Sequence, residues 1–152
     1  MSMFGEQEAE RILLERAADA AVYERRRLDE AIFDHDMEPF ISAVFGLLKD
    51  SADGFNTRMN LSGDDAMTFG RSGTTQIEIG KRTNPFVRRK VMFRKEKREV
   101  IVRTEQLIHY RQQPAKEEWW RFTVEHGKLL LDGKTPPECA DALFSGLADA
   151  FR

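Results

Sequence analysis

The sequence predicts an α+β protein: a long N-terminal helix and a second helix, then an antiparallel sheet of about six or seven strands, then a C-terminal amphipathic helix packed on the sheet. Three observations carry this prediction. Residues 5–53 contain a high share of Ala, Glu, Arg and Leu and repeat apolar side chains at a helical period. Residues 55–131 instead alternate apolar and polar side chains between turns that contain Gly, Asn or Pro. Beyond Lys134 the helical period returns.

The first predicted helix covers residues 5–37, where no proline occurs. Its apolar stripe is narrow and charged side chains surround it, as in a helix that is mostly solvated. The stripe consists of Leu13, Ala17, Ala20, Ala21, Leu28, Ala31, Ile32 and His35. About 33 helical residues span about 50 Å, whereas a compact protein of this length is only about 40 Å across. We therefore expect two parts: residues 1–37, a long charged helix that projects or dimerises, and residues 38–152, a single α+β domain.

A second helix is expected to begin at Asp36, because Asp is a favoured capping residue and Pro39 then falls in the first turn. Its wide apolar face contains Phe40, Ile41, Val44, Leu47 and Leu48. Gly54 is expected to end it. The alternation of Phe55, Thr57, Met59 and Leu61 then predicts a first strand.

A hairpin is predicted from strands at residues 86–94 and 99 to about 112, joined by a turn at residues 95–98. This register places Arg94 opposite Glu99, Met92 opposite Ile101 and Arg88 opposite Glu105. One face, with Val91, Phe93, Val100 and Val102, belongs to the core. The other face is charged, but it also carries Met92, Ile101 and Leu107. Trp119 joins that face, because adjacent residues of a strand point to opposite sides and Trp120 belongs to the core.

The charge of the chain changes sign along its length. Residues 81–121 carry 13 Lys or Arg against 5 Asp or Glu, whereas residues 1–50 carry 6 against 12. The basic side chains of the hairpin are candidate contacts for an anion or a nucleic acid: Arg88, Lys90, Arg94, Lys95, Lys97 and Arg98. Glu99 and Glu105 lie opposite two of these residues in the predicted register, which favours cross-strand ion pairs instead. An acidic helix and a basic sheet face are complementary, within one chain or between two.

The C-terminal helix has the clearest local signal. Thr135 and Glu138 form a predicted capping box, and Pro136 follows the cap at a position where its missing N–H has no cost. An apolar stripe then runs to the end of the chain: Ala140, Leu143, Phe144, Leu147, Ala148 and Phe151.

Because no catalytic or metal-binding motif occurs and no cofactor is implied, we favour a non-enzymatic protein-interaction module that is homodimeric or binds another protein. Its predicted interface is Met92, Ile101, Leu107 and Trp119 on the sheet with Leu13, Ala17 and Leu28 on the helix. Whether the helix covers its own sheet or that of a second copy stays open. One alternative is a nucleic-acid-binding module that uses the basic hairpin, residues 86–98. Another is a small-ligand-binding α+β domain with a pocket lined by Trp120, Phe122, Tyr110 and Arg111.

The same sequence predicts a cytoplasmic protein that binds no membrane. Three acidic residues precede any apolar run at the N-terminus, unlike in a secretory signal. The longest apolar runs are far shorter than a membrane span requires. Cys139 stands alone and cannot form an internal disulfide.

Overall fold

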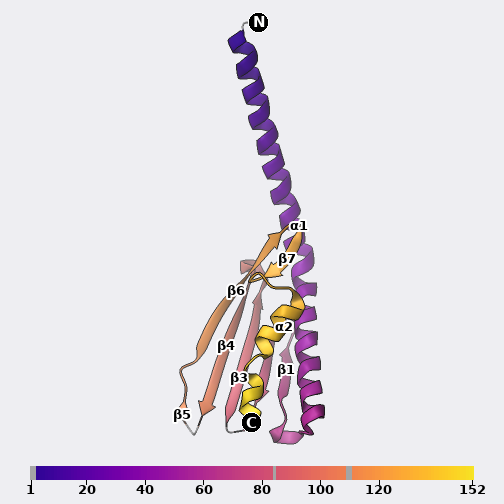
Figure 1. Cartoon of the computed structure of the whole chain (residues 1–152), viewed down its shortest axis with the longest axis vertical. Helices are drawn as coiled ribbons and strands as arrows, with labels where there is room; N and C mark the ends of the chain where they lie inside the picture. Colours follow the sequence, from indigo (N-terminus) through magenta and orange to yellow (C-terminus); the bar gives the residue numbers. More distant parts are fainter. Residues whose placement is uncertain (1–2, 84, 109–110) are drawn as a thin grey trace.

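The computed structural model describes residues 3–83, 85–108 and 111–152, and it confirms the α+β class. The chain begins with helix α1 (Met3–Met59), continues through an antiparallel sheet, and ends with helix α2 (Pro136–Phe144) and the 3-10 turn η3 (Leu147–Phe151). The first half of α1 stands away from everything else, while the sheet and α2 gather around its second half (Figure 1).

The sheet is an antiparallel meander in the order β1-β2-β3-β4-β6-β7. Its strands are β1 (Thr68–Ser72), β2 (Gln76–Lys81), β3 (Phe86–Arg94), β4 (Glu99–Ile108), β5 (Arg111–Gln112), β6 (Lys116–Glu125) and β7 (Lys128–Leu131). The short β5 pairs only with the end of β4. The predicted hairpin register is confirmed, with Arg94 opposite Glu99, Met92 opposite Ile101 and Arg88 opposite Glu105.

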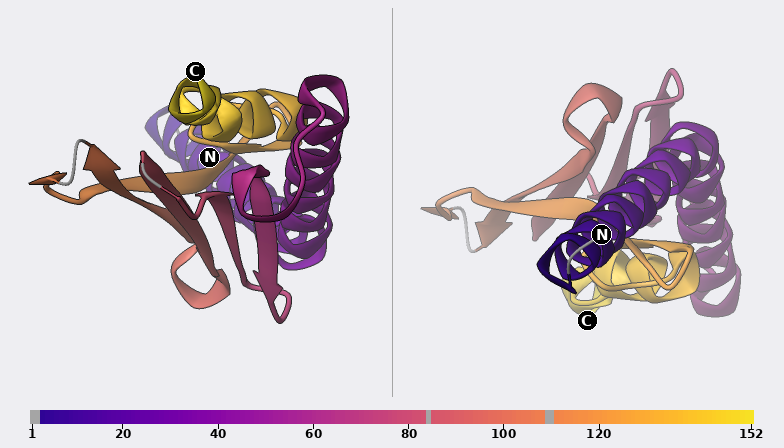
Figure 2. Two further views of the ribbon diagram at one scale, coloured as in Figure 1. Left: turned by 90° about the horizontal axis from the view of Figure 1, so that it is seen from below. Right: turned by 90° about the horizontal axis from the view of Figure 1, so that it is seen from above.

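Both helices lie on the same side of the curled sheet (Figure 2), which we call its inner face. The core forms there between α1, α2 and the sheet. Phe122 of β6 lies at its centre, with edge-to-face contacts to Phe40 of α1 at 5.3 Å and Phe93 of β3 at 5.8 Å between ring centroids. The opposite side of the sheet, the outer face, is covered by neither helix.

The predicted break at Asp36 is wrong, because α1 runs unbroken through Pro39. Asp36 and Pro39 resemble a helix start locally. Pro39 nevertheless lies on the exposed side of α1, where it removes one backbone hydrogen bond. Met37, Phe40 and Ile41 are buried on either side of it, and their packing holds the helix together.

The predicted strand at residues 55–61 is also wrong, because α1 continues to Met59. The ring of Phe55 lies against two rings from the end of the chain, Phe144 at 6.3 Å and Phe151 at 5.1 Å. The side-chain amide of Asn56 donates to the carbonyl of Met67 and accepts from its N–H, at 2.8 and 2.7 Å. These distant contacts select the helical conformation over the alternation that the local sequence suggested.

The predicted capping box of the C-terminal helix is present. The backbone N–H of Thr135 donates to the Glu138 carboxylate at 3.1 Å, and the Thr135 hydroxyl donates to the same group at 2.8 Å. These hydrogen bonds lower the pKa of Glu138. The helix ends at Phe144, earlier than expected, because Gly146 turns the chain with φ of 83°. The guanidinium of Arg89 then holds that end by donating to the carbonyls of Leu143 and Ser145.

Candidate interaction surfaces

Helix α1 has two parts with different environments. We call residues 3–36 the arm and residues 37–59 the anchored part. No residue of the arm is buried, whereas the anchored part contributes seven buried residues to the core. The arm makes ion pairs within its own helix: Arg11 with Glu8 and Glu15, and Arg27 with Glu24. The hydrogen bond from Arg27 lowers the pKa of Glu24. Because these pairs are exposed to solvent, each contributes little to the stability of the helix.

The predicted apolar stripe of the arm is open to solvent. Leu13 is 61% exposed and Leu28 is 54% exposed, and Ala17 is exposed as well. The sequence reasoning missed Leu14, which is 72% exposed. A seven-residue repeat would have revealed it, since Gln7, Leu14, Ala21, Leu28 and His35 recur at that spacing along one side of the helix.

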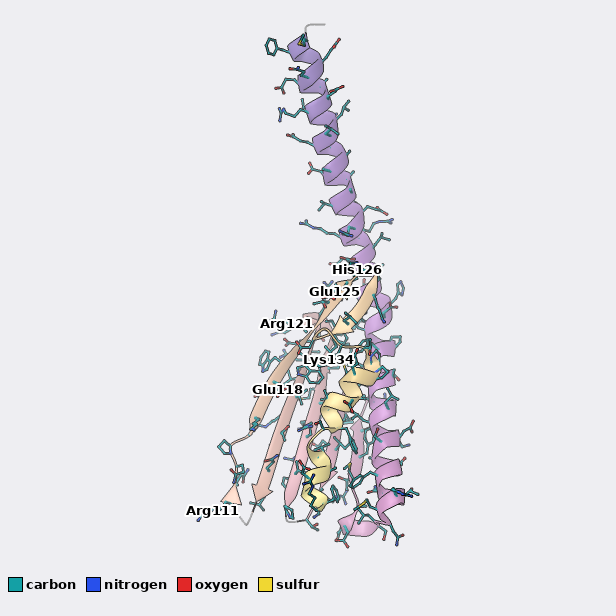
Figure 3. All side chains as sticks on the ribbon, viewed as in Figure 1. Arg111, Glu118, Arg121, Glu125, His126 and Lys134 are labelled. Carbon is teal, nitrogen blue, oxygen red and sulfur yellow. The ribbon has the colours of Figure 1, made fainter. Side chains whose placement is uncertain are left out.

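Near its base, the stripe becomes one wall of a shallow groove of about 680 Å³, which we call the elbow groove. Its apolar lining comes from Ala21, Leu28, Ala31 and Ile32 of the arm. Gly127, in the turn between β6 and β7, contributes to the opposite wall. The neighbouring Glu125 and His126 lie beside α1 where the arm leaves the rest of the molecule (Figure 3). The position of this turn depends on the tertiary fold, so no local sequence pattern could have placed it.

The base of the arm is tied to the turn between β3 and β4. Arg98 pairs with Glu30 at 2.6 Å, and its guanidinium carbon lies 4.0 Å from the centroid of the Phe33 ring. Lys95 pairs with Glu38 at 3.0 Å. The complementary charges of helix and hairpin therefore meet at this turn and not across the outer face of the sheet.

On the outer face, an apolar row lies among charged rows. Strand pairing aligns Met92, Ile101 and Trp119 across β3, β4 and β6. Ile101 is only 6% exposed and Trp119 is 54% exposed. Leu107 lies further along β4, opposite Phe86. Because α1 packs on the inner face, it does not cover this row within its own chain. Of the two arrangements that the sequence left open, the structure therefore does not show the one in which the helix covers the outer face of its own sheet.

Most of the candidate anion-binding residues have carboxylate partners. Lys95 and Arg98 hold the arm, and the other pairs lie on the strands: Arg88–Glu105, Lys90–Glu78 and Arg94–Glu99. The hydrogen bond from Arg88 lowers the pKa of Glu105, as expected for a carboxylate that stays ionised. Among the residues the structure describes, Lys97 forms no ion pair.

The residues expected to line a small-ligand pocket do not come together as one. Trp120 and Phe122 are buried in the core, and Arg111 is exposed on β5 at the far end of the sheet (Figure 3). Tyr110 lies outside the described residues. The Trp120 indole N–H donates to Glu118 at 3.1 Å, and the Lys134 ammonium lies 5.0 Å from its ring centroid.

Neither a metal cluster nor a membrane-spanning helix occurs in the part of the chain that the structure describes. There, no three His, Cys, Asp or Glu side chains are grouped closely enough to hold an ion. None of the described helices combines the length and the apolar character that crossing a bilayer requires.

The chain matches no protein-family model, and searches of curated proteins and of solved structures found no match.

Proposed function

We propose that this chain is a non-enzymatic protein-interaction module that forms a homodimer through its arm. One observation carries the proposal: the arm is a helix of more than thirty residues whose apolar stripe is exposed from Leu13 to Ala31. Helices in water gain most of their stability from packing an apolar face, and single short helices are marginal. A second arm supplies the missing packing.

The elbow groove supports the same proposal. It continues the stripe of the arm into a hollow between α1 and the β6–β7 turn, so the apolar surface is larger than the helix alone provides. Contiguous apolar surfaces rimmed by charge are typical of protein–protein contacts. Glu24, Arg25 and Asp36 form such a rim.

Sedimentation velocity of the full chain tests the proposal. We expect a dimer that dissociates when Leu28→Glu places a charge in the stripe. The matched control is Trp119→Ser, which removes the exposed side chain of the outer face and should leave the dimer intact. A chain that is monomeric up to millimolar concentration would contradict the proposal. A dimer that Trp119→Ser disrupts and Leu28→Glu spares would place the interface on the sheet.

The nucleic-acid alternative has less support, because five of its six candidate cations pair with carboxylates of the same chain. It makes a separate prediction. Binding to phosphates through the hairpin would weaken steeply as salt rises from about 50 to 200 mM. A gel-shift titration with DNA and RNA measures that dependence, and we expect no salt-sensitive complex.

A further inference from the structure

We infer that the two arms of the homodimer pair antiparallel. In their register, residue n of one copy lies opposite residue 35 − n of the other, so that Leu14 lies opposite Ala21. Met3 of each copy then enters the elbow groove of the other. This inference rests on the proposed function and specifies how the second copy binds.

The seam of the pairing is a heptad pattern on one side of the arm. Two series alternate along it at spacings of three and four residues. The first contains Gln7, Leu14, Ala21, Leu28 and His35; the second contains Met3, Glu10, Ala17, Glu24 and Ala31. Such spacing keeps a continuous face toward a second helix. In this register the first series meets itself, and the second series meets the adjacent residues Arg11, Ala18, Arg25 and Ile32 of the other copy. The small side chains from Ala17 to Ala21 lie at its middle, where they allow the two backbones to approach closely.

The charges of the arm disfavour a parallel pairing in which identical residues of the two copies face each other. That arrangement would place Glu10 against Glu10 and Glu24 against Glu24 inside the seam, and like charges in contact are destabilising. The antiparallel register instead places Glu10 of one copy beside Arg25 of the other, twice in the symmetric dimer. Neither Glu10 nor Arg25 forms an ion pair with any other residue that the structure describes, so both are available to a second chain.

The same register brings apolar residues together at the centre and at the ends of the arm. Leu14 meets Ala21 near the centre, and Gln7 meets Leu28 further out. At the end, Met3 meets Ile32. Both Leu28 and Ile32 line the elbow groove, so Met3 of the second copy arrives at this hollow.

The groove suits a methionine. Gly127 borders it, and the space beside this residue is open, since a Cβ built there would contact nothing within 4 Å. Met3 itself is 73% exposed in the single chain. A flexible thioether side chain adapts well to an irregular apolar hollow.

Disulfide trapping in the full-length protein tests the orientation. We expect a mixture of Gln7→Cys and Leu28→Cys chains to form a mixed disulfide dimer on mild oxidation, while each variant alone gives at least tenfold less product. The control mixture of Ile12→Cys and Tyr23→Cys has the same register on the opposite side of the helix and should not cross-link. The native thiol does not interfere, because burial raises the pKa of Cys139 to about 12.

The possible outcomes separate the inference from the proposed function. Efficient self-cross-linking of Leu28→Cys alone would show a parallel pairing and overturn the inference, while the homodimer stands. A sedimentation dimer in which neither the mixture nor the single variants cross-link would overturn it too. A chain that sediments as a monomer would remove both.

Charge exchange gives an independent readout. Glu10→Arg and Arg25→Glu should each weaken the dimer by about tenfold, because each variant sets two like-charge contacts in place of two ion pairs. The double variant exchanges both charges and should recover most of the affinity. If Glu10→Arg strengthens the dimer, Glu10 faces another carboxylate and the antiparallel register is wrong.

Discussion

The arm and the anchored part of α1 belong to one helix, yet their surroundings are opposite. Leu48 in the anchored part is fully buried, whereas Leu28 in the arm is 54% exposed. The anchored part is held by the sheet and α2. The arm relies on its intrinsic propensity and on pairs such as Arg11–Glu15. The comparison teaches that packing at one end can start a helix that then continues into solvent, since propagation costs far less than nucleation.

The same substitution in both parts gives the largest expected contrast. Leu48→Ala should lower the free energy of unfolding by about 2–5 kcal/mol, because it leaves a cavity in the core. Leu28→Ala should change it by less than about 0.5 kcal/mol in the monomer, since little is buried there. Urea unfolding at low protein concentration measures both. Similar losses for the two variants would mean that the arm folds back onto the rest of the chain.

The boundary between the two parts offers the next largest effect. Pro39→Ala should raise the free energy of unfolding by about 1–2 kcal/mol, because alanine restores an N–H donor to the carbonyl of His35 and favours the helix. The control is Asp36→Ala, which should be neutral or slightly stabilising within a continuous helix. A loss of about 1 kcal/mol with Asp36→Ala would instead reveal a cap, and therefore a helix break at this position.

The smallest effect concerns the contact that fixes the base of the arm. Arg98→Ala removes the ion pair with Glu30 and the contact with the Phe33 ring, and should cost about 1 kcal/mol. The neighbouring Lys97→Ala should change nothing, because Lys97 has no carboxylate partner among the described residues. Thermal unfolding of both variants at low and at high salt measures this difference. An effect of Arg98→Ala that vanishes at low salt would show that the arm is not fixed at this turn.

The local sequence predicted the sheet well. The prediction failed where contacts with distant parts of the chain determine the secondary structure. The β3–β4 register follows from the alternation of apolar and polar residues in the two strands and from the short turn that joins them. All of this information lies within about twenty residues of sequence. The end of α1 depends on Phe144 and Phe151, about ninety residues further along the chain than Phe55. No window around Phe55 contains that information.

The candidate interaction surfaces also divide into features that the local sequence could predict and features that depend on the tertiary fold. The exposure of the arm follows from its length, because a helix longer than the domain has nowhere to pack. The elbow groove could not be anticipated, since it needs the β6–β7 turn beside Leu28 and Ile32.

The unbroken passage of α1 through Pro39 has a mechanical consequence. A continuous helix is a rigid spacer. It fixes both the distance and the angle between the groups at its two ends, because it contains no flexible linker. In the proposed dimer, about thirty paired residues hold the two sheets about 45 Å apart. A partner that contacted both sheets of the dimer at once would have to span that distance.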